Sequence, residues 1–135
     1  MIDRVTFEKT TFAGLPAKFE AGTPHVAGGI GLGTALDYLM AIGMDAVEAS
    51  EHELIAYAEA QLAAVPGLRF IGTPETRAGA ISFVLEGIHP YDAGTVLDRL
   101  GVAVRTGQHC AQPVMDRFGV DGTIRASFAL YNTPA

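Results

Sequence analysis

A change of hydrophobic period at Pro66-Gly67 limits the possible folds of this chain more than any other feature. Before this point, apolar residues recur at helical spacing over 25–43 and 45–65. After it, short apolar segments bounded by turn residues are separated by two short helical segments. Because helices come first and strands with interposed helices follow, the pattern predicts an α+β fold, a small and mainly antiparallel sheet covered by helices. The pattern does not predict the strand order.

Two long helices are predicted in the first half. The helix over 25–43 ends at Gly43, and its apolar face consists of Ile30, Leu32, Ala35, Leu36 and Leu39. The helix over 45–65 begins with Asp45 as a capping residue and ends at Pro66-Gly67. Its apolar face consists of Val47, Leu54, Ile55, Ala58 and Leu62.

The second half is predicted to supply the sheet. The expected strands are 68–72, 80–87, 102–107 and 122–133. The strand over 102–107 places Arg105 at its exit into a loop. Helices are expected over 89–101 and over 112–119, the latter with Pro113 in its first turn.

The chain divides into an extended arm and one small domain. Residues 1–24 are too rich in glycine and proline for a helix and are predicted to form the arm, which contains the motif EAGTP at 20–24. Residues 25–135 form the predicted small domain. The ending NTPA is typical of the cap and first residue of a helix, so we expect the domain to be truncated before its last helix.

Composition narrows the class of protein. The 135 residues are 49% apolar and 18% charged, as in a globular domain. The net charge of −6, without a basic run, argues against a nucleic-acid surface. A lone cysteine cannot form an internal disulfide, and Asp3 and Glu8 stand where a signal peptide would be apolar, so we expect a cytoplasmic protein. No apolar run approaches the ~20 residues needed to cross a bilayer.

Cys110, in the stretch RTGQHC, is the candidate nucleophile. It follows a predicted strand and a glycine, and it precedes a helix whose N-terminal amides favour an anion. Arg105 and His109 are close in sequence and would favour the thiolate. The alternative is a small buried hydrophobic residue, which is what most free cysteines are. The residues alone leave both possibilities open.

Arg105 and Arg125 are candidate ligands for an anion. Each lies in a predicted strand, flanked by small or apolar residues. A guanidinium at a strand end can bind a carboxylate through two parallel hydrogen bonds. The alternative is a structural salt bridge with one of the 15 acidic residues, and the spacing alone favours that alternative.

The EAGTP motif is a candidate phosphate site. Gly22 offers a backbone amide and Thr23 a hydroxyl just ahead of a glycine-rich helix start. An ordinary turn and helix cap is the competing interpretation.

No metal site is expected. The four histidines have no ligand spacing with Cys110, so a zinc site is not predicted. His52 and His89 are expected to be solvated surface residues.

Three stretches resemble the C-terminal part of the group II cysteine desulfurases, the SufS-type and selenocysteine lyase-like enzymes of the class-V aminotransferase family. They are KFEAGTPHVAGGIGLGTALDYL, GVAVRTGQHCAQPVMDRFGV and IRASFALYNT. The resemblance keeps the same order over essentially all of the chain, and the patterns R-T-G-x-H-C-A-x-P and R-A-S-x-x-x-Y-N-T are highly specific. It implies the small C-terminal domain of a homodimeric, fold-type I enzyme that uses pyridoxal 5′-phosphate (PLP), with 1–24 as an arm from the large domain.

The resemblance also implies roles for single residues. Enzymes of this kind convert L-cysteine to L-alanine and an enzyme-bound persulfide, which supplies a sulfur-acceptor protein for iron-sulfur cluster assembly. Cys110 would carry the persulfide, Arg125 would bind the substrate carboxylate, and Arg105 would lie near both. Gly22 and Thr23 would reach the PLP phosphate of the other subunit. Gln108 stands where histidine is common in the family.

Some family features are missing from these residues. The PLP-bearing lysine belongs to the large domain, and Lys9 and Lys18 match no such motif. The chain by itself is therefore predicted neither to bind PLP covalently nor to desulfurate cysteine.

Two other functions remain open. Cys110 would serve a non-enzymatic thiol carrier or interaction module equally well, and the family resemblance also admits a selenocysteine lyase. Comparing the rates with cysteine and selenocysteine would distinguish the two enzymes.

Overall fold

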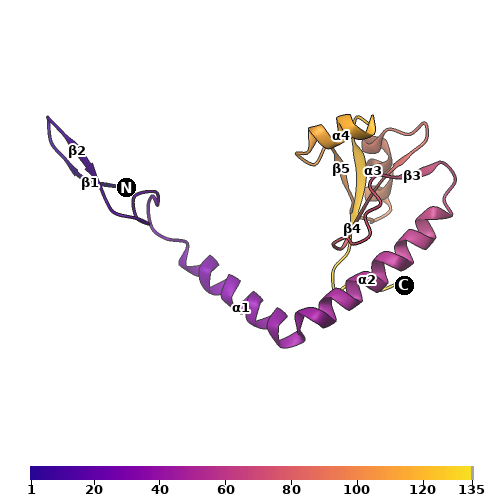
Figure 1. The fold of residues 1–135 in the computed structure, drawn as a ribbon, viewed down its shortest axis with the longest axis horizontal. Coiled ribbons are helices and arrows are strands. Elements are labelled where there is room, and N and C mark those ends of the chain that lie inside the picture. Colours follow the sequence, from indigo (N-terminus) through magenta and orange to yellow (C-terminus); the bar gives the residue numbers. More distant parts are fainter. Residues whose placement is uncertain (135) are drawn as a thin grey trace. The chain divides into compact units, whose positions relative to one another are not determined.

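The computed structural model of the protein describes residues 1–134. Its contacts divide the chain into two compact units, Met1–Ile42 and Gly43–Ala135, which we call the first and second units (Figure 1). The contact boundary falls after Ile42, so the first long helix groups with the N-terminal arm. The domain boundary after residue 24 stays a prediction.

The N-terminal arm is folded into a hairpin. Strands β1 (Ile2–Val5) and β2 (Thr10–Phe12) pair antiparallel. The amide of Thr6 donates to the Lys9 carbonyl at 2.8 Å, and the Lys9 amide donates to the Thr6 hydroxyl at 3.0 Å. This turn returns the chain on itself, so residues 2–12 of the predicted extended arm form a hairpin of two extended strands.

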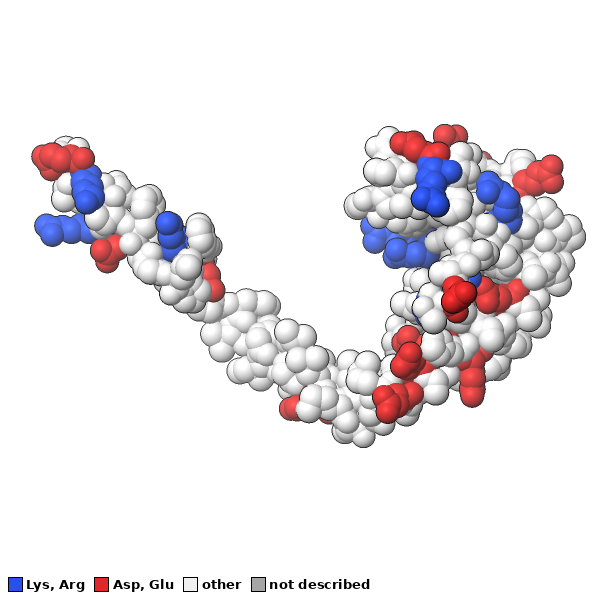
Figure 2. Space-filling model, viewed as in Figure 1, with Lys and Arg blue, Asp and Glu red and all other residues white. Residues whose placement is uncertain are grey.

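Helix α1 (Val26–Ile42) confirms the predicted first helix. None of its residues is buried, so the predicted apolar face has no cover within the first unit. Asp37 is its one charged residue, and the segment appears almost entirely white in Figure 2. No single helix among residues 1–134 is long and apolar enough to cross a membrane, although α1 and α2 taken together as a bent pair pass by length and composition.

The second unit contains an antiparallel four-stranded sheet in the order β3-β4-β6-β5. Its strands are β3 (Leu68–Phe70), β4 (Ala80–Leu85), β5 (Arg105–Gly107) and β6 (Thr123–Ser127). The predicted α+β class and antiparallel pairing are confirmed. Strand β5 is shorter than predicted and begins at Arg105, so this residue lies at the start of its strand and not at its exit.

Helices α2 (Met44–Ala63) and α3 (Pro90–Arg99) cover one face of this sheet. Strands alternate their side chains between two faces, and the inward set packs against both helices. The resulting core consists of Ile55, Ala58, Ile81, Phe83, Ala93 and Ile124. The short helix α4 (Gln112–Phe118) connects β5 to β6 and contributes the buried Met115. The other sheet face carries the polar residues of the candidate site.

One local prediction about a helix start is wrong. Gly43, not Asp45, is the N-cap of α2, and it offers no side chain to the first turn. Asp45 lies inside that turn, where its charge still favours the positive helix end. His89 is exposed, as predicted, and it also caps α3, because its Nδ1 accepts from the Tyr91 amide at 3.3 Å.

The C-terminal segment carries no helix in the described part of the chain. Strand β6 ends at Ser127, earlier than predicted, and residues 132–134 are irregular. The predicted cap segment NTPA includes Ala135, which lies outside the described residues.

Candidate active site

Arg105 and Arg125 lie side by side on the open face of the sheet. The register pairs Arg105 of β5 directly with Arg125 of β6, and Ser82 of β4 with Arg125. Directly paired residues project from the same face. Since the neighbouring Ile124 points into the core, this row of side chains projects away from α2 and α3.

Neither arginine has an acidic partner within residues 1–134. The ion pair found there joins Arg77 Nη2 to Glu59 Oε1 at 2.8 Å and involves neither Arg105 nor Arg125. The Nε atom of Arg125 is buried and has no hydrogen-bond partner. The structural salt bridge that the spacing favoured is therefore not formed. Two like charges directly opposite each other destabilise a sheet, so this pair suits an anion that would bind between them.

Cys110 lies on a tight turn with an unusual backbone. The Ala111 amide donates to the Gln108 carbonyl at 2.9 Å, and the two central residues have positive φ, 54° at His109 and 58° at Cys110. This conformation costs a non-glycine residue roughly 1–2 kcal/mol. The turn presents Cys110 as an exposed free thiol. The alternative of a buried core cysteine therefore does not hold in this structure.

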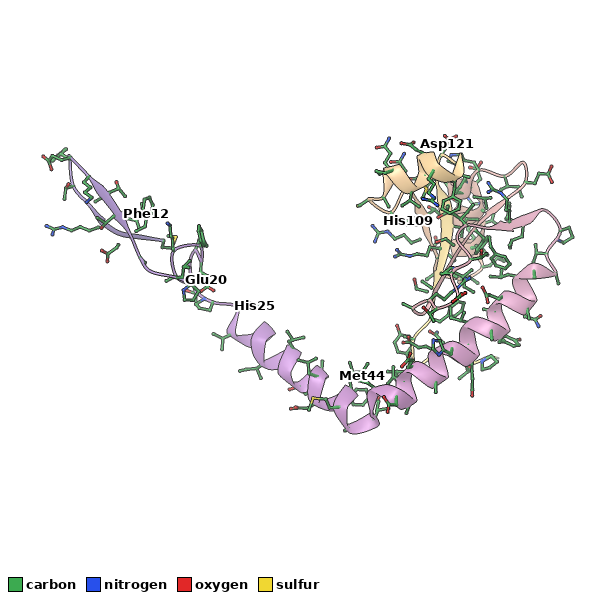
Figure 3. All side chains as sticks on the ribbon, viewed as in Figure 1. Phe12, Glu20, His25, Met44, His109 and Asp121 are labelled. Carbon is green, nitrogen blue, oxygen red and sulfur yellow. The ribbon has the colours of Figure 1, made fainter. Side chains whose placement is uncertain are left out.

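His109 ties the turn to the sheet. Its Nε2 lies 2.8 Å from the hydroxyl of Thr123, which is fully buried. Figure 3 labels His109 in the second unit. Burial lowers the pKa of His109, the Arg125 guanidinium lowers it further, the backbone of Thr123 acts in the opposite direction, and Arg105 also lowers it. The ring is therefore held neutral beside two cations. Its Nδ1 is buried without a partner.

A pocket of about 230 Å³ opens beside these groups. Its polar lining comes from Ser82, His109, Thr123 and Arg125, and its apolar lining comes mainly from α4 and Ile71. This volume is below the range typical of drug-sized ligands, so the pocket suits a small molecule. The combination of a guanidinium, a neutral imidazole and a nearby exposed thiol can bind a small carboxylate and offer it a sulfur nucleophile.

Residues 1–135 match the family model of the class-V aminotransferases. The chain belongs to this family. A probable cysteine desulfurase of Streptomyces coelicolor is 56% identical over 137 residues, which cover 100% of this chain and 33% of that protein. A cysteine desulfurase of Synechococcus elongatus is 53% identical over 133 residues, covering 98% of this chain and 21% of that protein.

Solved structures of family members have the same fold. The crystal structure of the cysteine desulfurase CsdA of Escherichia coli, in its S-sulfonic acid form, aligns with a TM-score of 0.84 and 42% identity over 99% of this chain and 33% of that one. The apo cysteine desulfurase of Thermococcus onnurineus aligns with a TM-score of 0.80 and 36% identity over 98% of this chain and 33% of that one. The chain thus spans about a third of these enzymes.

Family membership implies PLP dependence, and two residues of the first unit fit its phosphate chemically. Gly22 has a φ of 77°, and both Gly22 and Thr23 are exposed. The Thr23 hydroxyl has no hydrogen-bond partner among residues 1–134, so the hydroxyl and the neighbouring amides are free to donate to an anion. These residues belong to the first unit and are not among those that the second unit brings together.

The lysines of the chain lie on the first unit's surface. Lys18 Nζ lies 5.6 Å from the ring centroid of Phe19 and 6.0 Å from that of Phe12. Lys9 is exposed in the hairpin. Among the described residues, no group of three or more His, Cys, Asp or Glu side chains could hold a metal ion.

Thr123 and Gly122 were not predicted as site residues from the sequence. Thr123 stands two residues before Arg125, which places both on the same face of β6, and this alternation was available in the sequence. A Cβ atom at Gly122 would lie 3.1 Å from the Cα of Gly107, so glycine lets β5 and the start of β6 approach closely. That contact joins residues distant in sequence and leaves no local signal.

Proposed function

We propose that this chain is the part of a PLP-dependent cysteine desulfurase that binds the substrate carboxylate and supplies the sulfur-accepting thiol. One observation carries the proposal: two cross-strand arginines without an acidic partner in residues 1–134 stand beside the turn that exposes Cys110. The similarity to proteins named cysteine desulfurases supports the choice of substrate.

The proposed roles follow from burial and charge. Arg125 is half-buried with an unpaired Nε, so it would hold the carboxylate of L-cysteine through two hydrogen bonds. Arg105 is exposed, and its positive charge would attract and help to orient the same carboxylate. Gly22 and Thr23 would contribute donors to the PLP phosphate, as the resemblance implies, from the other subunit of a homodimer. Bound PLP supplies the electron sink for the reaction.

The thiol of Cys110 performs the sulfur transfer. Its thiolate attacks the sulfur of the substrate, an S–S bond forms on Cys110, and the C–S bond of the substrate breaks with its electron pair left on carbon. A proton taken up by that carbon completes L-alanine. One enzyme thiol and one cysteine thus yield one persulfide and one alanine, with no external oxidant. A neutral His109 keeps a third positive charge away from the carboxylate site.

The exposed position of Cys110 supports transfer to a second protein. A persulfide on this turn would be reached from solvent by a sulfur-acceptor protein. We propose that the sulfur serves iron-sulfur cluster assembly in the cytoplasm and that the enzyme is of the SufS type.

Alanine release by the full-length, PLP-loaded protein tests this function. We expect Cys110→Ser to abolish alanine release and Arg125→Gln to raise KM strongly. Arg69→Gln is the matched control, because Arg69 is an exposed arginine on β3 that pairs with Val84 and lies outside the pocket. Wild-type alanine release from Cys110→Ser would refute the proposal. A higher kcat/KM for selenocysteine than for cysteine would assign a selenocysteine lyase instead.

A further inference from the structure

Thr123 is a polar residue in a place that packing alone does not explain. Its side chain is fully buried at the start of β6, on the face that carries Arg125. Its hydroxyl lies 2.8 Å from His109 Nε2. Burying a hydroxyl costs folding free energy unless the hydroxyl forms a hydrogen bond. The Thr123 hydroxyl forms its hydrogen bond with the turn that presents Cys110.

The turn has few other hydrogen bonds to hold it. Within the turn, the Ala111 amide donates to Gln108, and both central residues keep positive φ. His109 Nδ1 has no partner among residues 1–134. The contact between Thr123 and the His109 ring is therefore the side-chain hydrogen bond that fixes the turn to the sheet in the described structure.

We propose that Thr123 is a positioning residue that acts through His109 to hold the 108–111 turn in its left-handed form, and so sets where Cys110 stands relative to Arg125. Thr123 does not touch the substrate in this account. Its importance for catalysis rests on the proposed function, whereas its hold on the turn does not. The lowered pKa of His109 agrees with this role, because a neutral ring can remain beside Arg125 while it bonds to an uncharged hydroxyl.

Two substitutions separate the hydroxyl from the volume of the side chain. Thr123→Val keeps the shape and removes the hydrogen bond, and Thr123→Ser keeps the hydroxyl. Thr106→Val is the matched control. Thr106 lies on the neighbouring strand β5, pairs with Ile124 and makes no side-chain hydrogen bond within residues 1–134.

Amide hydrogen exchange of Ala111 in the 135-residue chain measures the turn directly, because this amide closes it. We expect Thr123→Val to accelerate this exchange about fivefold, the loss of one net hydrogen bond, while Thr123→Ser and Thr106→Val stay near wild type. The amide of Ile81 in β4 reports the sheet and should not change. Unchanged Ala111 exchange in Thr123→Val, or equal acceleration at Ile81, would overturn the proposal, since the residue would then have no role or only a general structural one.

A second measurement tests the catalytic consequence in the full-length, PLP-loaded protein. Thr123→Val should slow persulfide formation on Cys110 about fivefold with KM for L-cysteine unchanged, and Thr123→Ser should restore the rate. A raised KM with an unchanged rate would contradict a positioning role. If the wild-type protein makes no persulfide at all, the proposed function fails. The exchange of the Ala111 amide would still show whether Thr123 stabilises the turn.

Discussion

The two cross-strand arginines, Arg105 and Arg125, should contribute unequally to carboxylate binding. Carboxylate binding can be measured by titrating the 135-residue chain with propionate. Propionamide, a neutral ligand of the same shape, is the control. Arg125 is half-buried and its Nε lacks a partner, whereas Arg105 is exposed on the edge strand. A hydrogen bond between charged groups contributes about 1.5–3 kcal/mol, and an exposed ion pair about 0.2–1 kcal/mol.

These energies give distinct expectations for two variants. Arg125→Gln should weaken propionate binding by roughly 10- to 150-fold, and Arg105→Gln by no more than about fivefold. The contribution of Arg105 should also fall as salt is raised to about 1 M, because the screening length shrinks from ~10 Å to ~3 Å. Arg69→Gln should have no effect, since Arg69 lies on β3, which β4 separates from the strands that carry Arg105 and Arg125.

The assay follows the side-chain Nε–Hε resonance of Arg125 by NMR during the titration. Saturable shifts with propionate and none with propionamide are expected. The reasoning would be refuted if propionamide bound equally well, or if the loss of exposed Arg105 cost as much as the loss of half-buried Arg125.

Two further predictions concern stability. The pKa of His109 is lower in the folded protein than the ordinary histidine value of 6.5. At pH values below 6.5 the unfolded chain therefore binds more protons than the folded chain. The free energy of unfolding should consequently fall as the pH drops through that region. His109→Gln should flatten this pH dependence, as measured by urea unfolding at several pH values, and an unchanged slope would contradict the assignment. Ile124→Ala should cost about 2–5 kcal/mol, because Ile124 is 0% exposed in the core. Val96→Ala, at a residue 58% exposed, should change the unfolding free energy by less than about 0.5 kcal/mol.

Periodicity predicted the elements of this chain because it reports which side chains are buried. Helical spacing identified the inward residues of α2, of which Val47, Leu54, Ile55 and Ala58 are buried. Helical spacing also predicted α1, although none of its residues is buried in the structure. Asp45 was predicted as the N-cap of α2 from its residue type alone, whereas the backbone conformation makes Gly43 the N-cap.

The site itself was only partly predictable. The sequence indicated Arg105, Arg125 and Cys110 as candidates, but their juxtaposition depends on the register of two strands whose arginines are 20 residues apart along the chain. The pairing of two strands that are distant along the chain leaves no local pattern in the sequence. The positive φ of His109 and Cys110 was equally hidden, because such turns usually carry Asn or Gly at these positions.

The location of the transferred sulfur tests the central claim most directly. The full-length, PLP-loaded protein would be mixed with one equivalent of L-cysteine, quenched and digested, and each peptide weighed by mass spectrometry. We predict one additional sulfur atom on the peptide that contains Cys110, and none in Cys110→Ser. Sulfur found on another residue, or alanine formed while Cys110 stays unmodified, would contradict the claim that this exposed thiol beside two unpaired arginines is the sulfur acceptor.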